Sequence, residues 1–417
     1  MYENKEKQQT ALLAAVDTGE FDVQRSVDEL EELAKSAGAV VKGRVIQRKE
    51  RPDPATLMGT GRLEEVAEFV RANEIDLVIF DHELAPAQQK NLENALDVAV
   101  IDRTTLILDI FAQRAKTSEG RLQVELAQLK YRLPRLSGLG TSLSRLGGGI
   151  GTRGPGESKL ESDRRHIRRR IHSLEEELKE LEKRRGLLRQ RRKKDDVISV
   201  AIVGYTNVGK STLLNTLTDA GVLAKDMLFA TLDPTARALR LPCGKTVMLI
   251  DTVGLVRRLP HHLVQAFKST LEQAATADII LNICDASSVE SQVHLTVTKT
   301  LLEELGCKDR PIIPVLNKCD LVPEINHMPM IGGAVRISAA TGQGVDHLLE
   351  VIEENLPVKN TKVELLLPFS KSGLAAEIRK DGTVLQEEYV EEGLHLVAMV
   401  TPDLLQQVLP YAILGEE

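Results

Sequence analysis

The chain contains no tryptophan, and aromatic residues make up only 3% of its 417 residues. Its cores must therefore be built from leucine, isoleucine, valine and alanine. Cysteine is also scarce, and none of the four forms a C-x-x-C pair: Cys243, Cys284, Cys307 and Cys319. Three of them lie in or beside apolar, strand-like runs, so we expect reduced, buried thiols rather than a disulfide framework or a zinc site.

Long hydrophobic runs are missing as well. The first ten residues are polar, and the apolar runs are far shorter than the roughly 20 residues that span a bilayer. The sequence therefore predicts a cytoplasmic protein without a transmembrane segment. With 42% hydrophobic and 28% charged residues, the composition is that of a globular protein. Its length predicts roughly two to four domains.

Residues 1–103 alternate strand-like and helical segments. The hydrophobic pattern predicts strands at 10–16, 40–46, 76–80 and 98–101, and helices at 27–36, 63–73 and 85–95. Strands that alternate with helices predict an α/β domain with a largely parallel sheet.

Residues 104–194 differ because apolar residues recur at heptad spacing in two stretches. The first contains Ala115, Leu122, Leu126, Leu129 and Leu133, and the second Leu160, Ile167, Ile171, Leu174, Leu178, Leu181 and Leu188. These repeats predict two helices of an antiparallel coiled-coil hairpin. The intervening segment 134–157 holds eight glycines, which predicts a loop.

The hairpin is basic while the rest of the chain is acidic. Residues 153–194 contain 16 lysines and arginines against 8 acidic residues, a net charge of +8, which leaves −15 for the remainder of a chain whose total is −7. A solvated coiled-coil face of mixed charge is the plain explanation. However, the glycine-rich loop carries Arg135, Arg145 and Arg153 and has no acidic residue before Glu157, and structure alone gives no reason for that.

A glycine-rich motif follows the apolar strand expected at 197–203. It reads Gly204-Tyr-Thr-Asn-Val-Gly-Lys-Ser211 and continues into an amphipathic helix through Leu217. Strand, loop and helix in this order are the context of a phosphate-binding loop, where glycine amides and the helix N-terminus hold phosphate. Lys210 would bridge the β- and γ-phosphates, and Ser211 would ligate Mg²⁺. Alone, such a match can be accidental, and even a true phosphate-binding loop can belong to an ATPase.

A second motif ends the strand expected at 246–250 and reads Asp251-Thr-Val-Gly254. Asp251 can hold the metal through water, and the Gly254 amide can sense the γ-phosphate. Between the two motifs, Phe229-Ala-Thr-Leu-Asp-Pro234 offers Thr231 as a second hydroxyl ligand for the oxygen shell of Mg²⁺. Taken alone, a loop threonine more often caps a turn.

Base recognition is predicted at the ends of two later strands. The strand at 312–316 precedes Asn317-Lys-Cys-Asp320, in which the Asp320 carboxylate can accept two hydrogen bonds from guanine that adenine cannot offer. Lys318 can cover the base, and Asn317 can tie the loops together. The strand at 335–337 leads to Ser338-Ala-Ala-Thr341, whose backbone can contact the guanine carbonyl. Open α/β sheets bind ligands at such strand ends.

The sequence thus predicts one nucleotide site, with Lys210, Thr231 and Gly254 as catalytic candidates and Ser211, Thr231 and, through water, Asp251 as metal ligands. The residues expected to bind GTP are Gly204, Tyr205, Thr206, Asn207, Val208, Gly209, Lys210, Ser211 and Thr212, then Phe229, Ala230, Thr231, Leu232 and Asp233, then Asp251, Thr252, Val253 and Gly254, then Asn317, Lys318, Cys319 and Asp320, and finally Ser338, Ala339 and Ala340.

The five motifs resemble those of translation-factor-class GTPases, and the whole chain resembles the HflX family of ribosome-associated GTPases. Three segments outside the nucleotide site carry this resemblance: Met58-Gly-Thr-Gly-Arg62, Gly120-Arg-Leu-Gln-Val-Glu-Leu-Ala-Gln128 and Gly148-Gly-Ile-Gly-Thr-Arg-Gly-Pro-Gly-Glu157. The family pattern continues as Thr-Gln-Leu-Glu-Thr-Asp, where this chain has Ser-Lys-Leu-Glu-Ser-Asp and so keeps both hydroxyls.

The predicted fold class is α/β. A P-loop GTPase domain (197–358) is preceded by an α/β N-terminal domain (1–103) with a long basic antiparallel helical hairpin (104–194, with its glycine-rich loop at 134–157). A small α/β C-terminal domain (361–417) follows, with strands expected at 363–367 and 394–400 and a helix at 402–408.

The resemblance implies a protein that binds GTP and GDP, hydrolyses GTP with Mg²⁺ and associates with the large (50S) ribosomal subunit and its rRNA. It further implies a role in splitting or rescuing stalled ribosomes, or in ribosome biogenesis. The basic hairpin suits contact with rRNA phosphates, with Arg135, Arg145 and Arg153 as RNA-contact candidates. The alternative is a signalling GTPase with a protein coiled-coil partner. Heptads that one chain can satisfy favour a monomer.

Leu255 stands where Ras-like enzymes place a water-orienting glutamine, and an aliphatic side chain cannot orient water. We therefore expect slow basal hydrolysis that a macromolecular partner or a cation stimulates. Asn207 resembles the asparagine found in potassium-dependent GTPases, which makes K⁺ a further candidate cofactor.

Overall fold

The computed structural model describes residues 8–136, 155–194, 198–218, 228–229, 235–257, 276–308, 310–322, 333–357 and 361–413. By its internal contacts the chain divides into two compact units. The first comprises Met1–Gln190, Lys225–Asp233 and Val253–Ser269, and the second comprises Arg191–Ala224, Pro234–Thr252 and Thr270–Glu417.

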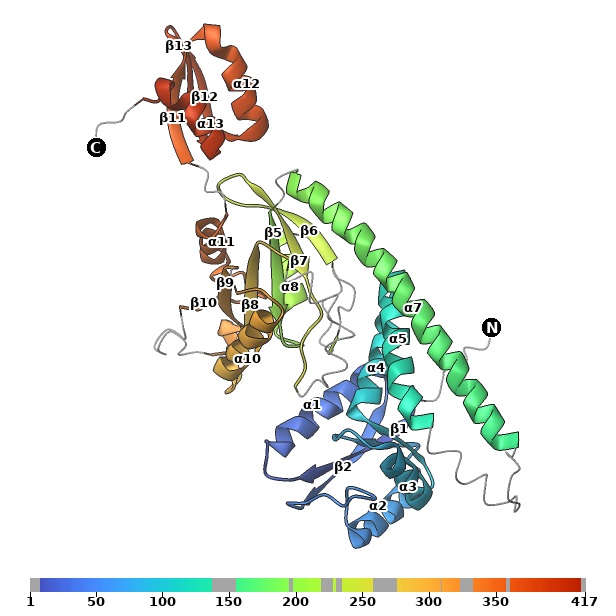
Figure 1. Cartoon of the computed structure of the whole chain (residues 1–417). Helices are drawn as coiled ribbons and strands as arrows, with labels where there is room; N and C mark the ends of the chain where they lie inside the picture. Colours follow the sequence, from blue (N-terminus) through green and yellow to red (C-terminus); the bar gives the residue numbers. More distant parts are fainter. Residues whose placement is uncertain are drawn as a thin grey trace, which may run out of the picture. The chain divides into compact units, whose positions relative to one another are not determined.

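The first unit is built on a four-stranded parallel sheet (Figure 1). Its strands are β1 (Thr10–Asp17), β2 (Val40–Arg48), β3 (Leu77–Phe80) and β4 (Ala99–Asp102), in the order β2-β1-β3-β4. Three helices connect them: α1 (Val23–Ser36), α2 (Thr60–Ala72) and α3 (Pro86–Leu96). The sequence prediction of a parallel α/β domain is confirmed for this part of the chain.

Side chains of β1 alternate between two apolar cores, one on each face of this sheet. Ala11, Leu13 and Ala15 lie in the core that also contains residues of α1, and Leu12 and Ala14 lie in the core formed with α2 and α3. All five are fully buried. This two-sided burial explains why the strand is a continuous apolar run.

Among the described residues, the first unit also contains α4 (Arg103–Arg114), α5 (Ser118–Arg135) and most of α7 (Pro155–Lys194), whose last residues belong to the second unit. The expected first arm of the hairpin is therefore two helices, because the chain leaves the helical conformation at Ala115 and Thr117 then caps α5 with its hydroxyl. The buried face of α5 is formed by Val124, Ala127 and Tyr131, whereas the leucines of the proposed heptad are half-buried.

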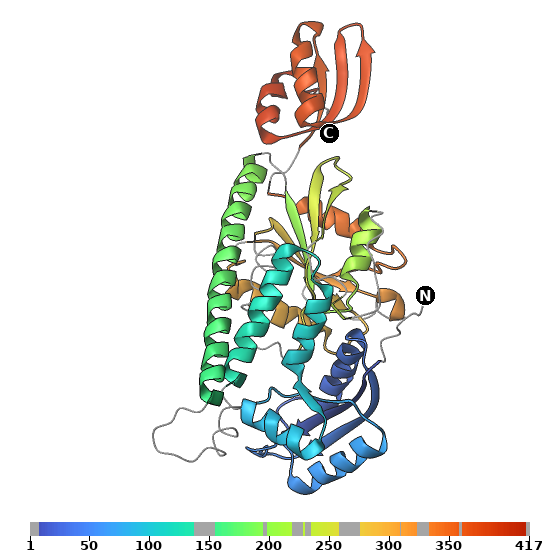
Figure 2. The same cartoon turned by 90° about the vertical axis from the view of Figure 1, so that its right-hand side faces the viewer.

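Helices α5 and α7 lie side by side in an antiparallel pair (Figures 1 and 2). Arg170 Nε lies 2.7 Å from Glu125 Oε1, and Lys130 Nζ lies 2.7 Å from Glu175 Oε1. Leu174 of α7 is fully buried, which marks it as an apolar anchor of the pair.

The larger sheet of the second unit has six strands in the order β10-β9-β8-β5-β7-β6, and β6 alone is antiparallel to its neighbour. They are β5 (Ser199–Gly204), β6 (Thr235–Arg240), β7 (Thr246–Asp251), β8 (Ile279–Asp285), β9 (Ile312–Asn317) and β10 (Val335–Arg336). Helices α8 (Lys210–Thr218), α10 (Ser291–Glu304) and α11 (Val345–Glu354) follow strands of this sheet. Parallel strands with helical connections confirm the predicted P-loop GTPase fold.

The end of the chain forms a small antiparallel sheet in the order β11-β13-β12. Its strands are β11 (Thr361–Leu367), β12 (Thr383–Val390) and β13 (Gly393–Val400), with helices α12 (Ser372–Asp381) and α13 (Pro402–Val408). Strand β12 and helix α12 were not predicted from the sequence.

Candidate nucleotide site

Two glycines shape the loop between β5 and α8. Gly204 has φ +158° and Gly209 has φ +92°. A Cβ atom at Gly204 would collide with the carbonyl oxygen of Ile283, and one at Gly209 would collide with the amide of Asn317. Only glycine therefore fits both positions, because each combines an unusual backbone conformation with close neighbours.

Lys210 is the first residue of α8, and its ammonium is directed back into the loop. Its Nζ donates to the carbonyl oxygens of Gly204 at 3.1 Å and Tyr205 at 2.7 Å. The residue is 7% exposed, and burial lowers the pKa of Lys210 to about 8, although Asp251 raises it in part. A phosphate group at this helix N-terminus would replace the two carbonyls as the partner of the ammonium.

Ser211 and Asp251 meet at the start of α8 and the end of β7. The Ser211 hydroxyl donates to Asp251 Oδ2 at 2.7 Å, and Asp251 is fully buried. Pairing of β7 with β5 holds this carboxylate in place, and the hydroxyl of Thr252 donates to the Ile202 carbonyl at 2.6 Å. A hydroxyl and a carboxylate are hard oxygen donors, so this pair fits Mg²⁺.

Asn317 joins the phosphate loop to the two loops expected to bind the base. Its Nδ2 donates to the Val208 carbonyl at 2.7 Å, and its Oδ1 accepts from the Ala339 amide at 2.8 Å. The side chain is 2% exposed. Asp320 lies at the surface of the same loop, with its carboxylate accessible, and Ser338 is fully buried.

Asp285 is a site residue that sequence reasoning missed. It ends β8 beside Asn317 of β9, and its Oδ2 lies 2.8 Å from Lys318 Nζ. Burial raises the pKa of Asp285, but Lys318 and Ser287 outweigh this and hold it below its ordinary value. The sequence signal that could have identified Asp285 is an apolar strand that ends in an aspartate, the same pattern that identified Asp251 at the end of β7. The ion pair fixes the lysine that is expected to cover the base.

Two residues expected near the nucleotide have buried side chains in the first unit. Phe229 is 2% exposed and Val253 is 5% exposed, and both belong to the apolar core that contains β1, α1 and α4 residues. These side chains therefore already have apolar partners. Ala230, Thr231, Leu232 and Asp233 lie outside the described residues.

The remaining nucleotide-site candidates lie in the loop between β5 and α8, in α8 itself, and after strands β7, β9 and β10. Asn207 adopts a left-handed conformation with φ 60°, and the ring of Tyr205 stacks on His294 of α10 with centroids 4.1 Å apart. Gly254 follows Val253 directly, and the other members are Thr206, Val208, Thr212, Cys319 and Ala340.

Of the three RNA-contact candidates, the structure describes only Arg135. Its guanidinium lies over the Tyr131 ring, 3.3 Å from the centroid, and donates to the Leu84 carbonyl at 2.8 Å. It also lies 3.3 Å from Asp102 Oδ2, and its side chain is 17% exposed. Arg135 is thus engaged within the first unit, while Arg145 and Arg153 lie outside the described residues.

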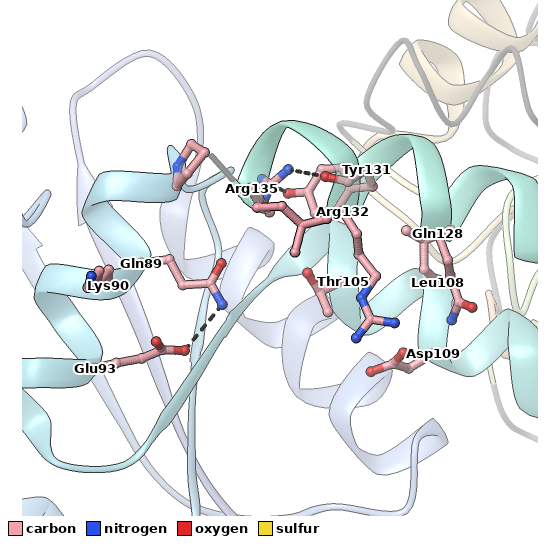
Figure 3. A pocket seen from close by; sticks show the side chains of 12 residues that line it. Gln89, Lys90, Glu93, Thr105, Leu108, Asp109, Gln128, Tyr131, Arg132 and Arg135 are labelled. Atoms are coloured by element: carbon pink, nitrogen blue, oxygen red, sulfur yellow. Dashed lines mark hydrogen bonds between the residues drawn. The ribbon is translucent and has the colours of Figure 1, made fainter. Parts of the chain in front are cut away.

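Arg135 also lines a cavity of about 460 Å³ formed by residues of α3, α4 and α5 (Figure 3). The figure shows Arg132 reaching from α5 toward Asp109 of α4, with Gln128 beside Leu108. Burial raises the pKa of Asp109, and Arg132 lowers it in part. The cavity wall therefore mixes amide groups with three cationic side chains (Lys90, Arg132 and Arg135) and two carboxylates (Glu93 and Asp109).

Across the described ranges, no helix is both long enough and apolar enough to cross a bilayer. The cysteines carry no disulfide, and Cys284, Cys307 and Cys319 are buried, as the sequence predicted.

Three protein families match consecutive parts of the chain. They are described as GTP-binding GTPase N-terminal (residues 24–112), GTP-binding GTPase Middle Region (114–192) and 50S ribosome-binding GTPase (199–318). The second match ends two residues before the end of α7, and the third begins with β5.

Full-length relatives carry the same name in several bacteria. GTPase HflX of Lacrimispora saccharolytica is 50% identical over 97% of this chain and 96% of its own length. GTPase HflX of Caldanaerobacter subterraneus subsp. tengcongensis is 50% identical over 98% of this chain and 95% of its own. A solved GTP-binding protein from Sulfolobus solfataricus, in complex with GDP, is 25% identical over 83% of this chain and 98% of its own, with a TM-score of 0.45. At half identity over nearly the whole length, and with the phosphate loop, the Ser211–Asp251 pair and the Asn317 junction in place, the chain is a GTP-binding, GTP-hydrolysing protein that belongs to the HflX family of GTPases.

Proposed function

We propose that this GTPase binds the large ribosomal subunit in its GTP-bound state and separates or rescues stalled ribosomes, with hydrolysis that the ribosome stimulates. The match of residues 199–318 to a family described as 50S ribosome-binding GTPase carries this proposal. Such a partner would locate the protein in the cytoplasm. A role in ribosome biogenesis would use the same nucleotide-gated contact.

The nucleotide would be held by the loop amides of residues 204–212, with Lys210 on the β- and γ-phosphates. Ser211, Thr231 and, through water, Asp251 would hold Mg²⁺, whose charge neutralises the transferred phosphate. Asp320 would accept the guanine hydrogen bonds while Lys318, fixed by Asp285, covers the base. Gly254 would donate its amide to the γ-phosphate.

Leu255 follows Gly254 and cannot orient the attacking water through a hydrogen bond. The basal rate should therefore be low, and a group from the partner would complete the site. Because Asn207 resembles the asparagine of potassium-dependent GTPases, K⁺ is a second candidate activator of GTP hydrolysis.

Contact with rRNA would use the basic ends of the long helix and the loop with Arg145 and Arg153. Phosphate neutralisation supplies affinity that falls steeply with salt. α7 already pairs with α5 in the same chain through Arg170–Glu125 and Lys130–Glu175, so this part of the helix has a partner within the chain. This supports a monomer and counts against the signalling alternative.

Co-sedimentation with purified large ribosomal subunits tests the proposal. We expect the protein to pellet with the subunits in the presence of a non-hydrolysable GTP analogue and to remain in the supernatant with GDP. Hydrolysis should accelerate when subunits are added. Binding that is equal with both nucleotides, or a rate that subunits do not change, would contradict the proposal.

A further inference from the structure

The antiparallel sheet near the end of the chain, which we call the C-terminal sheet, has one covered edge and one open edge. Its strand order is β11-β13-β12, so β11 and β12 are the edge strands. The last described residues run along β11, where Ala412 bridges to Leu365 and the Ile413 amide donates to the Glu364 carbonyl at 2.8 Å. Among the described residues, no backbone pairing lies on the outer side of β12. Strand β12 therefore offers free backbone donors and acceptors to another strand.

The side chains of β12 are unusually apolar for so exposed a strand. Six of its eight residues are exposed. Leu385 is 46% exposed, Tyr389 69% and Val390 37%. A single exposed apolar side chain is ordinary, but three on one open edge strand favour a surface that binds a partner.

Negative charge is concentrated on the same strand and the turn that follows it. Residues 383–392 contain four glutamates and no lysine or arginine. Glu387 pairs with Arg379 of α12, whereas the other three glutamates make no ion pair with any described residue. The open edge thus carries charge that the chain itself leaves largely unneutralised, and such charge attracts a cationic partner.

The register of β12 on β13 separates the charge from the aromatic ring. Tyr389 lies opposite Leu394, which belongs to the apolar core shared with α12 and α13, so Tyr389 is on the helix side of the sheet. Glu388 lies opposite His395 and is therefore on the other face, because neighbouring side chains alternate. A strand added at this edge would meet a carboxylate on one face and a tyrosine ring on the other.

We propose that the outer edge of β12 binds an extended, basic polypeptide, which joins the C-terminal sheet as a fourth strand. Backbone hydrogen bonds would supply affinity, and alternating side chains would supply selectivity. Lysine or arginine would face Glu388, and an apolar side chain would face Tyr389. RNA is disfavoured here, because its phosphates would meet four glutamates. A second copy of β12 is disfavoured as well, because like charges opposite each other destabilise a strand pair.

The probe for this site is a fluorescein-labelled peptide of alternating lysine and valine with blocked ends. Its lysines can lie on the face of Glu388 while its valines, which favour strands, lie on the face of Tyr389. Fluorescence anisotropy with the full-length protein measures its affinity. We expect it to bind at least about ten-fold more tightly than the same peptide with glutamate in place of lysine. Equal affinity for the two peptides would overturn the proposal.

The same lysine–valine peptide with every backbone amide N-methylated separates strand addition from simple attraction of charge. It keeps the lysines but loses the hydrogen-bond donors that a fourth strand needs. We expect its affinity to be about ten-fold lower or less, since several backbone hydrogen bonds are lost together. If it bound as tightly as the unmethylated peptide, the contact would be ionic only and the fourth strand would be wrong.

Glu388→Lys locates the binding site on the strand. This side chain is exposed and makes no ion pair with the described residues, so the fold should be kept, which circular dichroism checks. We expect the affinity for the lysine peptide to fall about five- to ten-fold. Glu377→Lys, at an exposed position of α12, makes the same charge change off the strand and should leave the affinity unchanged. A lysine peptide that bound Glu388→Lys and the unmodified protein equally would rule out this edge.

Sedimentation velocity tests the other occupant, a second copy of the chain. The unmodified protein should remain monomeric at low and high salt. A dimer whose amount changes in Glu388→Lys would show that β12 pairs with itself and would overturn the proposal. GDP affinity should be the same in Glu388→Lys, Glu377→Lys and the unmodified protein, so failure of this inference leaves the nucleotide site and the ribosome proposal untouched.

Discussion

Asn317 shows how one side chain can hold a binding site together. Because its amide satisfies both a carbonyl of the phosphate loop and the amide of Ala339 in buried surroundings, Asn317→Ala leaves two backbone groups without partners. We expect a loss of about 1–3 kcal/mol of unfolding free energy for each group, and weaker GDP binding. Urea unfolding measures the change in unfolding free energy, and GDP titration measures the change in affinity. Asn355→Ala, which removes a bond within α11 only, is the control and should change GDP binding little.

Asp320 is the residue on which base selectivity depends. Asp320→Asn exchanges a carboxylate that accepts two hydrogen bonds for an amide that also donates. We expect GDP affinity to fall about 10- to 100-fold, and xanthosine diphosphate, which carries an oxygen in place of the exocyclic amine, to be preferred. Competition between the two diphosphates measures this. Asp346→Asn, at an exposed carboxylate of α11, is the control, and retained guanine preference in Asp320→Asn would remove the assignment.

Glu29 predicts a pH dependence of stability with an unusual sign. Burial raises the pKa of Glu29 above 4.5 and Asp81 adds to this, although Arg103 and Arg257 lower it in part. The folded protein therefore binds this proton at higher pH than the unfolded chain does. The contribution of Glu29 to stability is complete below its unfolded pKa and is lost as pH rises through its folded pKa.

The measurement is the unfolding free energy of the unmodified protein minus that of Glu29→Gln. This difference should be largest below the ordinary glutamate pKa of 4.5 and should decrease as pH rises toward neutral. Glu31→Gln is expected to show the opposite slope, because Lys35 and Arg44 hold the pKa of Glu31 below its ordinary value even though burial opposes them. A difference for Glu29→Gln that rises with pH would contradict this argument.

At the scale of elements, α7 pairs with α5 through a buried leucine and exposed ion pairs. Leu174 is fully buried, while the ion pairs beside it are exposed on both partners. Leu174→Ala should therefore lower the unfolding free energy by about 2–5 kcal/mol, because it leaves a cavity. Glu125→Gln should cost far less, since exposed ion pairs contribute little. Thermal unfolding followed by circular dichroism compares the two, and equal midpoints would show that the helices pair through charge.

The hydrophobic pattern of the sequence predicted those strands and helices whose buried side chains form a regular pattern along the chain. The buried strands β1, β3, β5, β7 and β9 were predicted because they are apolar runs, and β5, β7 and β9 also lead into the nucleotide motifs. Strands β6 and β12 were missed because most of their side chains are exposed, so they carry little hydrophobic pattern. Strand β8 was not predicted either, although it is buried, because no nucleotide motif follows its apolar run. The break between α4 and α5 was missed because Ala115 suits the heptad, while the cap at Thr117 is a local signal easily attributed to a surface position.

The nucleotide site, like the fold, was predictable where the signal lies in a local sequence motif. Motifs at strand ends predicted the phosphate loop, the Ser211–Asp251 pair and the Asn317 junction, because parallel strands bring their carboxyl ends together. Contacts between residues far apart were out of reach: Glu29 and Arg257 are separated by 228 residues, and nothing local to either indicates the other. The burial of Phe229 was likewise invisible, since a lone aromatic residue in a loop fits nucleotide contact and core packing equally well.

For the whole molecule, the distribution of charge predicts how ribosome binding should respond to salt. The first half of α7 carries exposed Arg168 and Arg169 on a chain whose total charge is −7, so attraction to RNA must be local. Each phosphate neutralised contributes about 0.9 to the slope of log affinity against log salt for duplex nucleic acid, and about 0.7 for single strands. The double variant Arg168→Gln/Arg169→Gln should lower the magnitude of this slope by about 1–2.

The measurement is the concentration of large subunits that half-maximally stimulates GTP hydrolysis, taken at several salt concentrations. Lys299→Gln in α10 removes one exposed charge outside the basic helix and serves as the control, which should leave the slope unchanged. GDP affinity should be the same in all three proteins, because neither substitution lies in the nucleotide site. If the half-maximal concentration depended on salt with the same slope in the double variant and the unmodified protein, these arginines would not contact phosphate. The basic helix would then act as a structural support for the glycine-rich loop, and the salt-dependent contact would have to come from the loop itself.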